Sequence, residues 1–275
     1  MTAPADLSTP PDPVLSARPR GIAVRDALTM TWRNLLNLVR TPQVVVFATI
    51  QPLIFVLMFR YVFGGAIRPT SDFKYPYVDY LMPGVFAQTV VFGAMTTGVG
   101  LAEDLKKGLI GRFRSLPMAP SAVLVGRTLA DLVRNVFTIT LMVGVGFLIG
   151  FRVHTNAWAF FAGVGLMLLF AYSLSWVFAL VGLYTRDAEA AQAASFPIIA
   201  PLVFASAAFV PVAFMAGWLQ PFARNQPVSQ VISGVRALLA GGPTSGPVLH
   251  SLAWITGITL VFATLSIRKY RAAVT

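Results

Sequence analysis

The sequence predicts an all-α membrane protein whose chain crosses the bilayer several times. Its mean hydropathy is +0.73, and 56% of its 275 residues are hydrophobic while only 11% are charged. Uncharged apolar runs of about 20 residues recur along the chain, and a helix of that length crosses a hydrocarbon core of about 30 Å. These observations exclude an ordinary soluble domain and indicate a polytopic membrane protein.

Composition also narrows the chemistry. The chain has no cysteine, which excludes disulfides, thiolate metal sites and a cysteine nucleophile. Its net charge of +11 does not indicate nucleic-acid binding, because no compact basic domain stands outside the apolar runs and basic residues ordinarily flank membrane spans. We therefore expect membrane lipid, and no nucleic acid, among the partners.

The N-terminal part is expected to lie outside the bilayer core. Residues 1–20 contain five prolines and no apolar run, which predicts a disordered tail without a secretory signal. The stretch RDALTMTWRNLLNLVRTP then places apolar residues on one helical side and polar residues opposite, which predicts an interfacial helix on the cytoplasmic membrane surface. The residues assigned to this helix are Leu28, Trp32, Arg33, Leu35 and Val39.

The apolar runs predict six transmembrane helices. Their expected bounds are about 43–63, 79–101, 131–151, 157–184, 193–216 and 248–267. An even number of spans puts both termini on one side of the membrane, where fifteen basic residues fall against six on the other side. Because basic residues concentrate in cytoplasmic loops, we expect both termini in the cytoplasm.

The fifth run holds more apolar sequence than one span needs. Residues 190–223 carry no charge, and a straight helix of that length would extend about 50 Å. Pro211, Gly217 and Pro221 are candidate breaks in this run. We therefore expect the fifth span to end near 211–216.

The following stretch, NQPVSQVISGVRALLAGGP (residues 225–243), carries the signals of a short helix. Pro227 stands at its start and Gly241 follows its end. Its apolar residues share one helical face, and Arg236 lies off that face. We expect an external amphipathic helix or a re-entrant segment between spans five and six, with an ordinary extracellular loop as the alternative.

The stretch EDLKKGLIGRFRSLP (residues 103–117) differs from the rest of the chain, because six of its fifteen residues are charged. Its leucines and Phe113 fall at helical spacing on one face, while Gly108 and Gly111 lie beside Asp104, where another backbone has room to approach. The pattern predicts an amphipathic helix between spans two and three. It leaves open two roles, a solvated or lipid-facing linker and a docking helix for a soluble partner.

Two blocks of sequence resemble a known family. Residues 77–135, which include LAEDLKKGLIGRFRSLP, resemble the core of ABC-2 type permeases of the daunorubicin/doxorubicin-resistance kind, and residues 204–243 are similar to that family's outer segment between spans five and six. Ala216 departs from the proline that relatives usually have there. The resemblance implies an ABC-2 (type V exporter-like) transmembrane domain over residues 21–275, in a bacterial plasma membrane.

The resemblance also implies a function and partners. It predicts the permease subunit of an ATP-binding cassette exporter that moves a hydrophobic or amphipathic small molecule. The implied partners are a cytoplasmic ATPase subunit, which holds ATP and Mg, and a second permease subunit. In that family the helix between spans two and three, here about 103–116, docks onto the ATPase. The residues at that position are Glu103, Asp104, Lys106, Lys107, Gly108, Arg112 and Arg114.

The sequence itself carries no catalytic motif. It has no GxxxxGK[ST] phosphate-binding loop, so we expect no ATP hydrolysis by this chain, no cofactor on it and no metal site. Its two histidines, His154 and His250, have no carboxylate at helical spacing. Charged residues gather near the span ends, which disfavours an ion-coupled secondary transporter. An exporter of lipid-linked glycan or another lipid is the alternative within the class.

Two further sets of residues are functional candidates. Asp131 and Arg134, spaced i and i+3 at the expected start of span three, predict an ion pair with a structural or a gating role. Aromatic and amide residues of spans one and two are candidates for an apolar substrate cleft, with lipid contact and packing as the alternative. These residues are Gln51, Phe55, Phe59, Phe86 and Gln88.

Overall fold

The computed structural model describes residues 28–32, 36, 42–63, 75–108 and 120–274, and every regular element within them is helical. The expected all-α class is confirmed for this part of the chain. The elements are α2 (Pro42–Leu57), the π-helical turn η2 (Met58–Phe63), α3 (Tyr77–Lys106), α5 (Pro120–Leu148), α6 (Ala157–Thr185), α7 (Ala188–Phe204), the 3-10 turn η3 (Val212–Phe214), α8 (Gln220–Asn225), α9 (Pro227–Ala240) and α10 (Ser245–Val274).

In the described part of the chain, four helices are long and apolar enough to cross a membrane. They comprise residues Tyr77–Lys106, Leu124–Leu148, Ala157–Thr185 and Ser245–Ala272. Two further apolar helices are shorter, Ile50–Val62 and Ala188–Phe204. The 17 residues of α7 rise only about 25 Å, less than a hydrocarbon core of about 30 Å. The expected total of six spans therefore stays a prediction.

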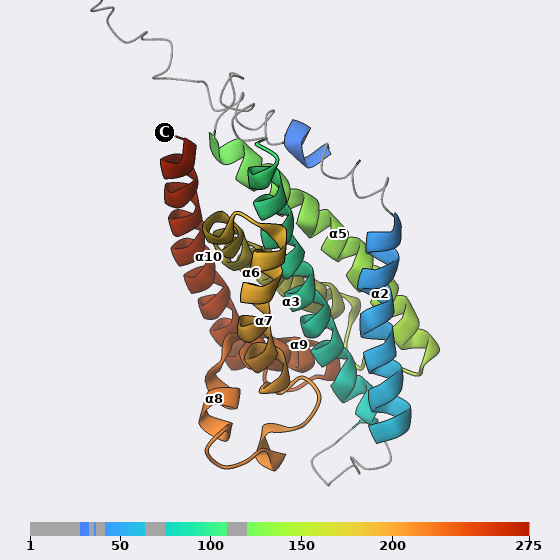
Figure 1. Ribbon diagram of the computed structural model, residues 1–275. Helices are drawn as coiled ribbons and strands as arrows, with labels where there is room; N and C mark the ends of the chain where they lie inside the picture. The colour runs from blue at the N-terminus through green and yellow to red at the C-terminus, as the bar shows by residue number, and fades with distance from the viewer. Residues whose placement is uncertain (1–27, 33–35, 37–41, 64–74, 109–119, 275) are drawn as a thin grey trace, which may run out of the picture.

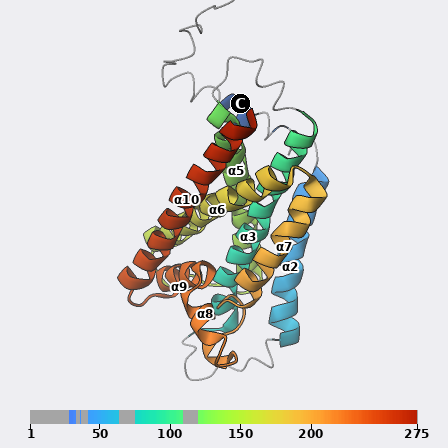
Figure 2. The same cartoon turned by 60° about the vertical axis from the view of Figure 1, so that its left-hand side comes forward.

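The helices form one bundle around α3 (Figure 1). The end of α3, the start of α5 and the C-terminal end of α10 lie together at one end of the bundle, which we call the Lys106 end. The opposite end, where α3 begins and where α8 and α9 lie, is the Tyr77 end (Figures 1 and 2).

Glycines bring α3 and α6 into backbone contact. A Cβ atom at Gly98 would lie 2.3 Å from the Phe178 carbonyl oxygen, and one at Gly182 would lie 2.2 Å from the Gly98 carbonyl oxygen. No side chain fits at either position without separating the two helices. The central helix is therefore fixed against α6 at closest range in its second half.

Apolar packing occurs in two clusters. The larger one joins α3, α6, α7 and α9, and buries Val85, Phe170, Val203 and Val231 among many others. A smaller cluster near the Lys106 end joins α3, α5, α6 and α10 through Leu101, Leu124, Trp176, Leu183 and Tyr270. The last turns of α10 are thus part of the bundle that surrounds the end of α3.

Two helix bounds depart furthest from the expected spans. The third helix begins at Pro120 rather than near 131. Proline fits the first position of a helix, because the amide hydrogen that it lacks would have no partner within the helix there. The fifth helix ends at Phe204 rather than near 211–216. Within α7, Pro197 and Pro201 each remove an amide donor, which weakens its last turns.

The short helix expected over 225–243 is present as α9. It begins at Pro227 and is capped by Gly241, which has a positive φ of 81°. Half of the residues of α9 are buried, including Val228, Ile232 and Leu239. It packs against α6 and α10 and also contacts α3, so it is an internal element of the bundle and not an ordinary loop.

Candidate functional site

The charged residues predicted to bind a partner lie at the Lys106 end. Helix α3 continues without a break through Glu103 to Lys106, so the expected start of a separate helix near 103 is wrong. The helix ends at Lys106 with Lys107 as its C-cap, and Gly108 follows with a positive φ of 67°. Of the predicted coupling residues, Arg112 and Arg114 lie outside the described residues.

An exposed ion pair closes the last turn of α3. Lys107 Nζ lies 2.6 Å from Glu103 Oε1, at i and i+4 on the helix. The hydrogen bond to Glu103 raises the pKa of Lys107 above its usual value. Both side chains are more than half exposed, so their charges are available to a soluble partner.

A second ion pair brings the α6–α7 turn to the same surface. Lys106 Nζ pairs with Asp187 Oδ1, and the hydrogen bond from Lys106 holds the pKa of Asp187 below its usual value. The other Asp187 oxygen accepts hydrogen bonds from the backbone of Glu189 and Ala190, which caps the start of α7. Sequence patterns did not reveal this contact, because Lys106 and Asp187 are 81 residues apart. We call Glu103, Lys106, Lys107 and Asp187 the charged surface.

Behind this surface, an ion pair joins α3 to α5. Arg127 Nη1 lies 3.1 Å from Asp104 Oδ2, and both side chains are largely buried. Gly100 makes room for the guanidinium group, since a Cβ atom there would lie 1.6 Å from Arg127 Nη2. The buried ring of Tyr270 brings the end of α10 to this region.

The predicted pair Asp131–Arg134 is present and lies further inside the bundle. Arg134 Nη1 is 2.9 Å from Asp131 Oδ1, and the two side chains are 9% and 8% exposed. Because α5 begins at Pro120, the pair lies about three turns into the helix and not at its start, which corrects the expected position.

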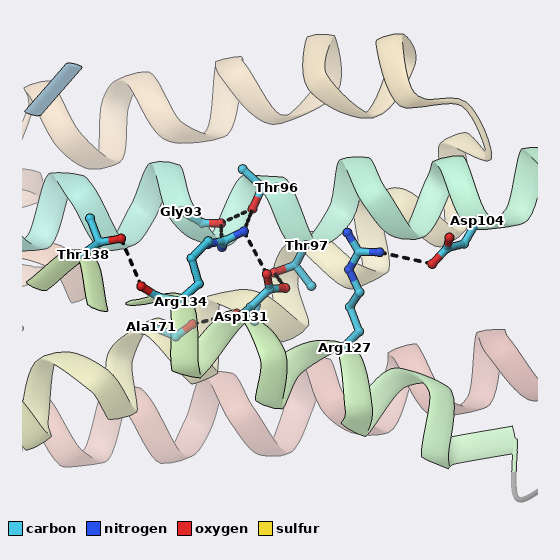
Figure 3. Close-up of polar contacts among 10 residues, drawn as sticks. Gly93, Thr96, Thr97, Asp104, Arg127, Asp131, Arg134, Thr138 and Ala171 are labelled. Carbon is cyan, nitrogen blue, oxygen red and sulfur yellow. Dashed lines mark hydrogen bonds and ion pairs between the residues drawn. The ribbon is translucent and has the colours of Figure 1, made fainter. Parts of the chain in front are cut away.

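The pair also binds α3 across the helix interface (Figure 3). Thr97 donates a hydrogen bond to Asp131, and Arg134 donates to the hydroxyl of Thr96. Arg134 Nη2 also donates to the Gly93 carbonyl oxygen at 2.7 Å. We call these contacts, together with Asp104–Arg127, the polar ladder.

The polar ladder restrains relative motion of α3 and α5. Charges that are buried away from water are costly unless they are paired and hydrogen-bonded, and each ladder charge has a partner of opposite sign. Sliding one helix past the other would separate these groups in a medium of low dielectric constant. The two helices are therefore expected to move together.

The predicted interfacial helix is described only in part. Residues 28–32 are helical, and Leu28 and Trp32 are 59% and 64% exposed. Arg33, Leu35 and Val39 lie outside the described residues. The location of this helix at a membrane surface therefore stays a prediction.

The residues predicted for a substrate cleft have different surroundings, and their role in a cleft stays a prediction. Phe55 and Phe59 lie together near Phe209, with the Phe59 and Phe209 rings 4.3 Å apart. Phe86 instead packs edge-on against Phe151. Gln51 is exposed, whereas Gln88 is 1% exposed and neither of its side-chain polar atoms has a hydrogen-bond partner.

At the Tyr77 end, the structure pairs a histidine with a carboxylate that the sequence did not link to it. His154 Nε2 lies 2.7 Å from Asp79 Oδ2, and the ring of Tyr75 stacks on His154. The other Asp79 oxygen accepts from the backbone of Arg152 at 2.9 Å. Within the described residues, no group of three or more metal-ligating side chains occurs.

Comparison with known proteins decides the family. The model of the ABC-2 type transporter family matches residues 25–240. The chain belongs to this family. The identification from residues 77–135 and 204–243 is thereby confirmed, and the chain is an ABC-2 permease.

Relatives of this ABC-2 permease have names that refer to drug resistance. It is 35% identical to the "Daunorubicin resistance ABC transporter permease protein DrrB1" of Streptomyces coeruleorubidus over 94% of this chain and 91% of the relative. It is 27% identical to the "Probable doxorubicin resistance ABC transporter permease protein DrrC" of Mycobacterium tuberculosis over 92% of this chain and 90% of the relative. A third relative, the "Doxorubicin resistance ABC transporter permease protein DrrB" of the same species, is 32% identical over 67% of this chain and 66% of the relative.

Proposed function

We propose that this ABC-2 permease is the membrane subunit of an exporter that moves a hydrophobic or amphipathic small molecule out of the cell. ATP hydrolysis on a separate ATPase subunit, which holds ATP and Mg, drives the transport. The observation that carries the proposal is the series of ion pairs that extends from the charged surface through the polar ladder into the bundle. The drug class follows from the names of the relatives.

In this proposal the Lys106 end faces the cytoplasm, and both termini lie on that side. Counted with α2 and α7, the permease has six spans in a bacterial plasma membrane, and residues 21–275 form one transmembrane domain. A second permease subunit completes the pathway. The sequence-based count of basic residues, fifteen on the expected side of the termini against six on the other, supports this orientation.

The ATPase would engage the charged surface. Glu103, Lys107 and the Lys106–Asp187 pair offer both signs of charge, which gives register and specificity to a contact that must hold while the partner moves. Movement of the ATPase would displace the end of α3 directly and the start of α7 through Asp187. The polar ladder would carry the same displacement to α5.

The proposal is tested in cells or vesicles that contain the permease and its ATPase. Replacing the phosphate-binding lysine of the ATPase should stop efflux of an anthracycline such as daunorubicin while the amount of permease in the membrane stays constant. Continued efflux that is instead abolished by an ionophore would support an ion-coupled transporter. A surface-polymer defect with normal drug efflux would support export of a lipid-linked glycan.

A further inference from the structure

A short non-helical segment follows α7 at the Tyr77 end. Residues 205–209, which we call the outer segment, leave the helix after Phe204, and Ser206, Ala207, Ala208 and Phe209 are each at most 6% exposed. Backbone that is not helical normally lacks hydrogen-bond partners at membrane depth, where each unsatisfied polar group costs several kcal/mol. The segment therefore needs partners from elsewhere in the protein.

Side chains of α3 and of the start of α9 supply these partners. From α3, the Tyr77 hydroxyl donates to the Phe209 carbonyl oxygen at 2.9 Å, and the Tyr80 hydroxyl donates to the Ala207 carbonyl oxygen at 3.2 Å. Gln226 Nε2 donates to the carbonyl oxygen of residue 205 at 2.7 Å, and Ser229 Oγ accepts from the amide of residue 207 at 3.0 Å. The segment is thus held by side chains rather than by a helical backbone ladder.

Arg236 of α9 joins the outer segment to α3. Its Nη2 donates to the Ala208 carbonyl oxygen at 3.2 Å, and its Nε and Nη2 donate to the Tyr80 carbonyl oxygen at 3.1 and 2.9 Å. Its guanidinium carbon lies 3.5 Å from the centre of the Tyr80 ring, a cation–π contact. Arg236 thus packs against two other elements, although it lies off the apolar face of α9.

The guanidinium group of Arg236 is partly buried and contacts uncharged partners, which makes its position costly. No carboxylate pairs with it among the residues that the structure describes, and the nearby Asp79 is bound by His154 and by the backbone of Arg152. A cation removed from water without an opposite charge destabilises the protein. The carbonyl oxygens of Tyr80 and Ala208 and the Tyr80 ring offset this cost, and they belong to two separate elements, so the contact breaks when those elements separate.

The outer segment also packs against the π-helical turn η2. The rings of Phe209 and Phe59 stack at 4.3 Å with an interplanar angle of 6°, and Phe55 and Phe204 complete the aromatic group. π-Helical turns occur frequently at functional sites. Withdrawal of the segment would uncover an aromatic surface of the kind that an apolar, ring-containing molecule can contact.

We propose that residues 205–209 form the exit gate of the permease and that Arg236 is the positioning residue that holds this gate against α3. The inference rests on the proposed function. Helix α3 has 30 residues and extends about 45 Å, so its two ends connect the charged surface to the gate. Displacement of α3 breaks the contacts of Tyr77, Tyr80 and Arg236 together, without unwinding any helix.

The test uses the permease together with its ATPase in proteoliposomes. The chain has no cysteine, so Ala207→Cys introduces a single reporter at a position that is 6% exposed. A charged maleimide added from the exit side should label it slowly in the resting complex. Trapping with ATP and vanadate should accelerate labelling about tenfold or more, since hydrogen bonds to a charged donor are lost. Equal labelling in the two states would overturn the gate assignment.

Arg236→Gln in the same background tests the positioning role. We expect about tenfold faster labelling at rest and reduced efflux with continued ATP hydrolysis, whereas Arg236→Lys should retain part of the protection. The control Arg224→Gln removes the same charge from an exposed residue whose guanidinium group donates to Gln220 and not to the outer segment, and should change neither quantity. Protected labelling and normal efflux in Arg236→Gln would overturn the inference.

A second variant keeps the test decisive if Arg236→Gln does not fold. Replacing Tyr77 and Tyr80 by Phe removes only the two hydroxyl donors and leaves the aromatic packing in place. Faster resting labelling supports the gate, and unchanged labelling contradicts it. The proposed function fails separately, if the unmodified complex shows no ATP-dependent efflux at all.

Discussion

Asp131→Asn is the sharpest test of the polar ladder. The substitution removes the negative charge that pairs with Arg134, whose side chain is 9% exposed. Removing one partner of a buried pair costs about 3–5 kcal/mol. Arg134 keeps its hydrogen bonds to Gly93 and Thr96, so we expect the lower value, about 3 kcal/mol. At about 2–4 °C per kcal/mol, the melting temperature should fall by about 6–12 °C.

The double variant Asp131→Asn/Arg134→Met separates this mechanism from a general loss of packing. Removing both charges abolishes the uncompensated cation, so the double variant should melt closer to the unmodified protein than Asp131→Asn does. Purified permease in detergent, followed by intrinsic fluorescence on heating, gives both values. Glu103→Gln, which breaks only an exposed pair, is the control and should leave the melting temperature unchanged. A double variant that melts at or below the melting temperature of Asp131→Asn would refute the idea that an uncompensated buried cation causes the loss.

Three further predictions follow from the packing and from the charged surface. Gly98→Ala places a methyl group 2.3 Å from the Phe178 carbonyl oxygen and should destabilise the bundle by about 1–3 kcal/mol, whereas Gly144→Ala, with nothing within 4 Å, should raise the melting temperature slightly. Lys106→Glu should reduce efflux and the amount of ATPase that co-purifies, and Lys106→Glu/Asp187→Lys should restore both; a swap that restores neither would count against a shared docking surface. Because the hydrogen bond from Lys106 lowers the pKa of Asp187, the ion pair is present above the ordinary carboxyl pKa and is lost only as the pH falls through the lowered value. The effect of Asp187→Asn on the melting temperature should therefore be constant from about pH 8 to 5 and decline only below about pH 4, and a loss near pH 6 would contradict this assignment.

Local sequence signals predicted those features that depend on neighbouring residues. The start and end of α9 follow from Pro227 and Gly241, and the Asp131–Arg134 pair follows from its i, i+3 spacing. Both depend on backbone geometry within a few residues. The lengths of the apolar runs likewise predicted where the long helices α3 and α6 begin, and where α6 ends, to within a few residues.

The periodicity of apolar residues did not predict the contacts between helices that are distant in the sequence. Lys106 meets Asp187, and His154 meets Asp79, only because antiparallel helices bring their ends together. The same holds for Arg236, since its helical position places it off the apolar face while its carbonyl acceptors come from the start of α3 and from the outer segment. A surface pattern on one helix does not reveal which neighbour covers it.

The short length of α7 has a consequence for the surrounding lipid. On the proposed topology, α7 supplies about 25 Å of helix, and the rest of the hydrocarbon thickness is crossed by chain whose hydrogen bonds come from α3 and α9. A thicker bilayer therefore strains the non-helical chain after α7, because the helix itself cannot lengthen. The thickness of the membrane thus acts on the same contacts that ATP is proposed to break, and acyl-chain length becomes a physical input to the transport cycle.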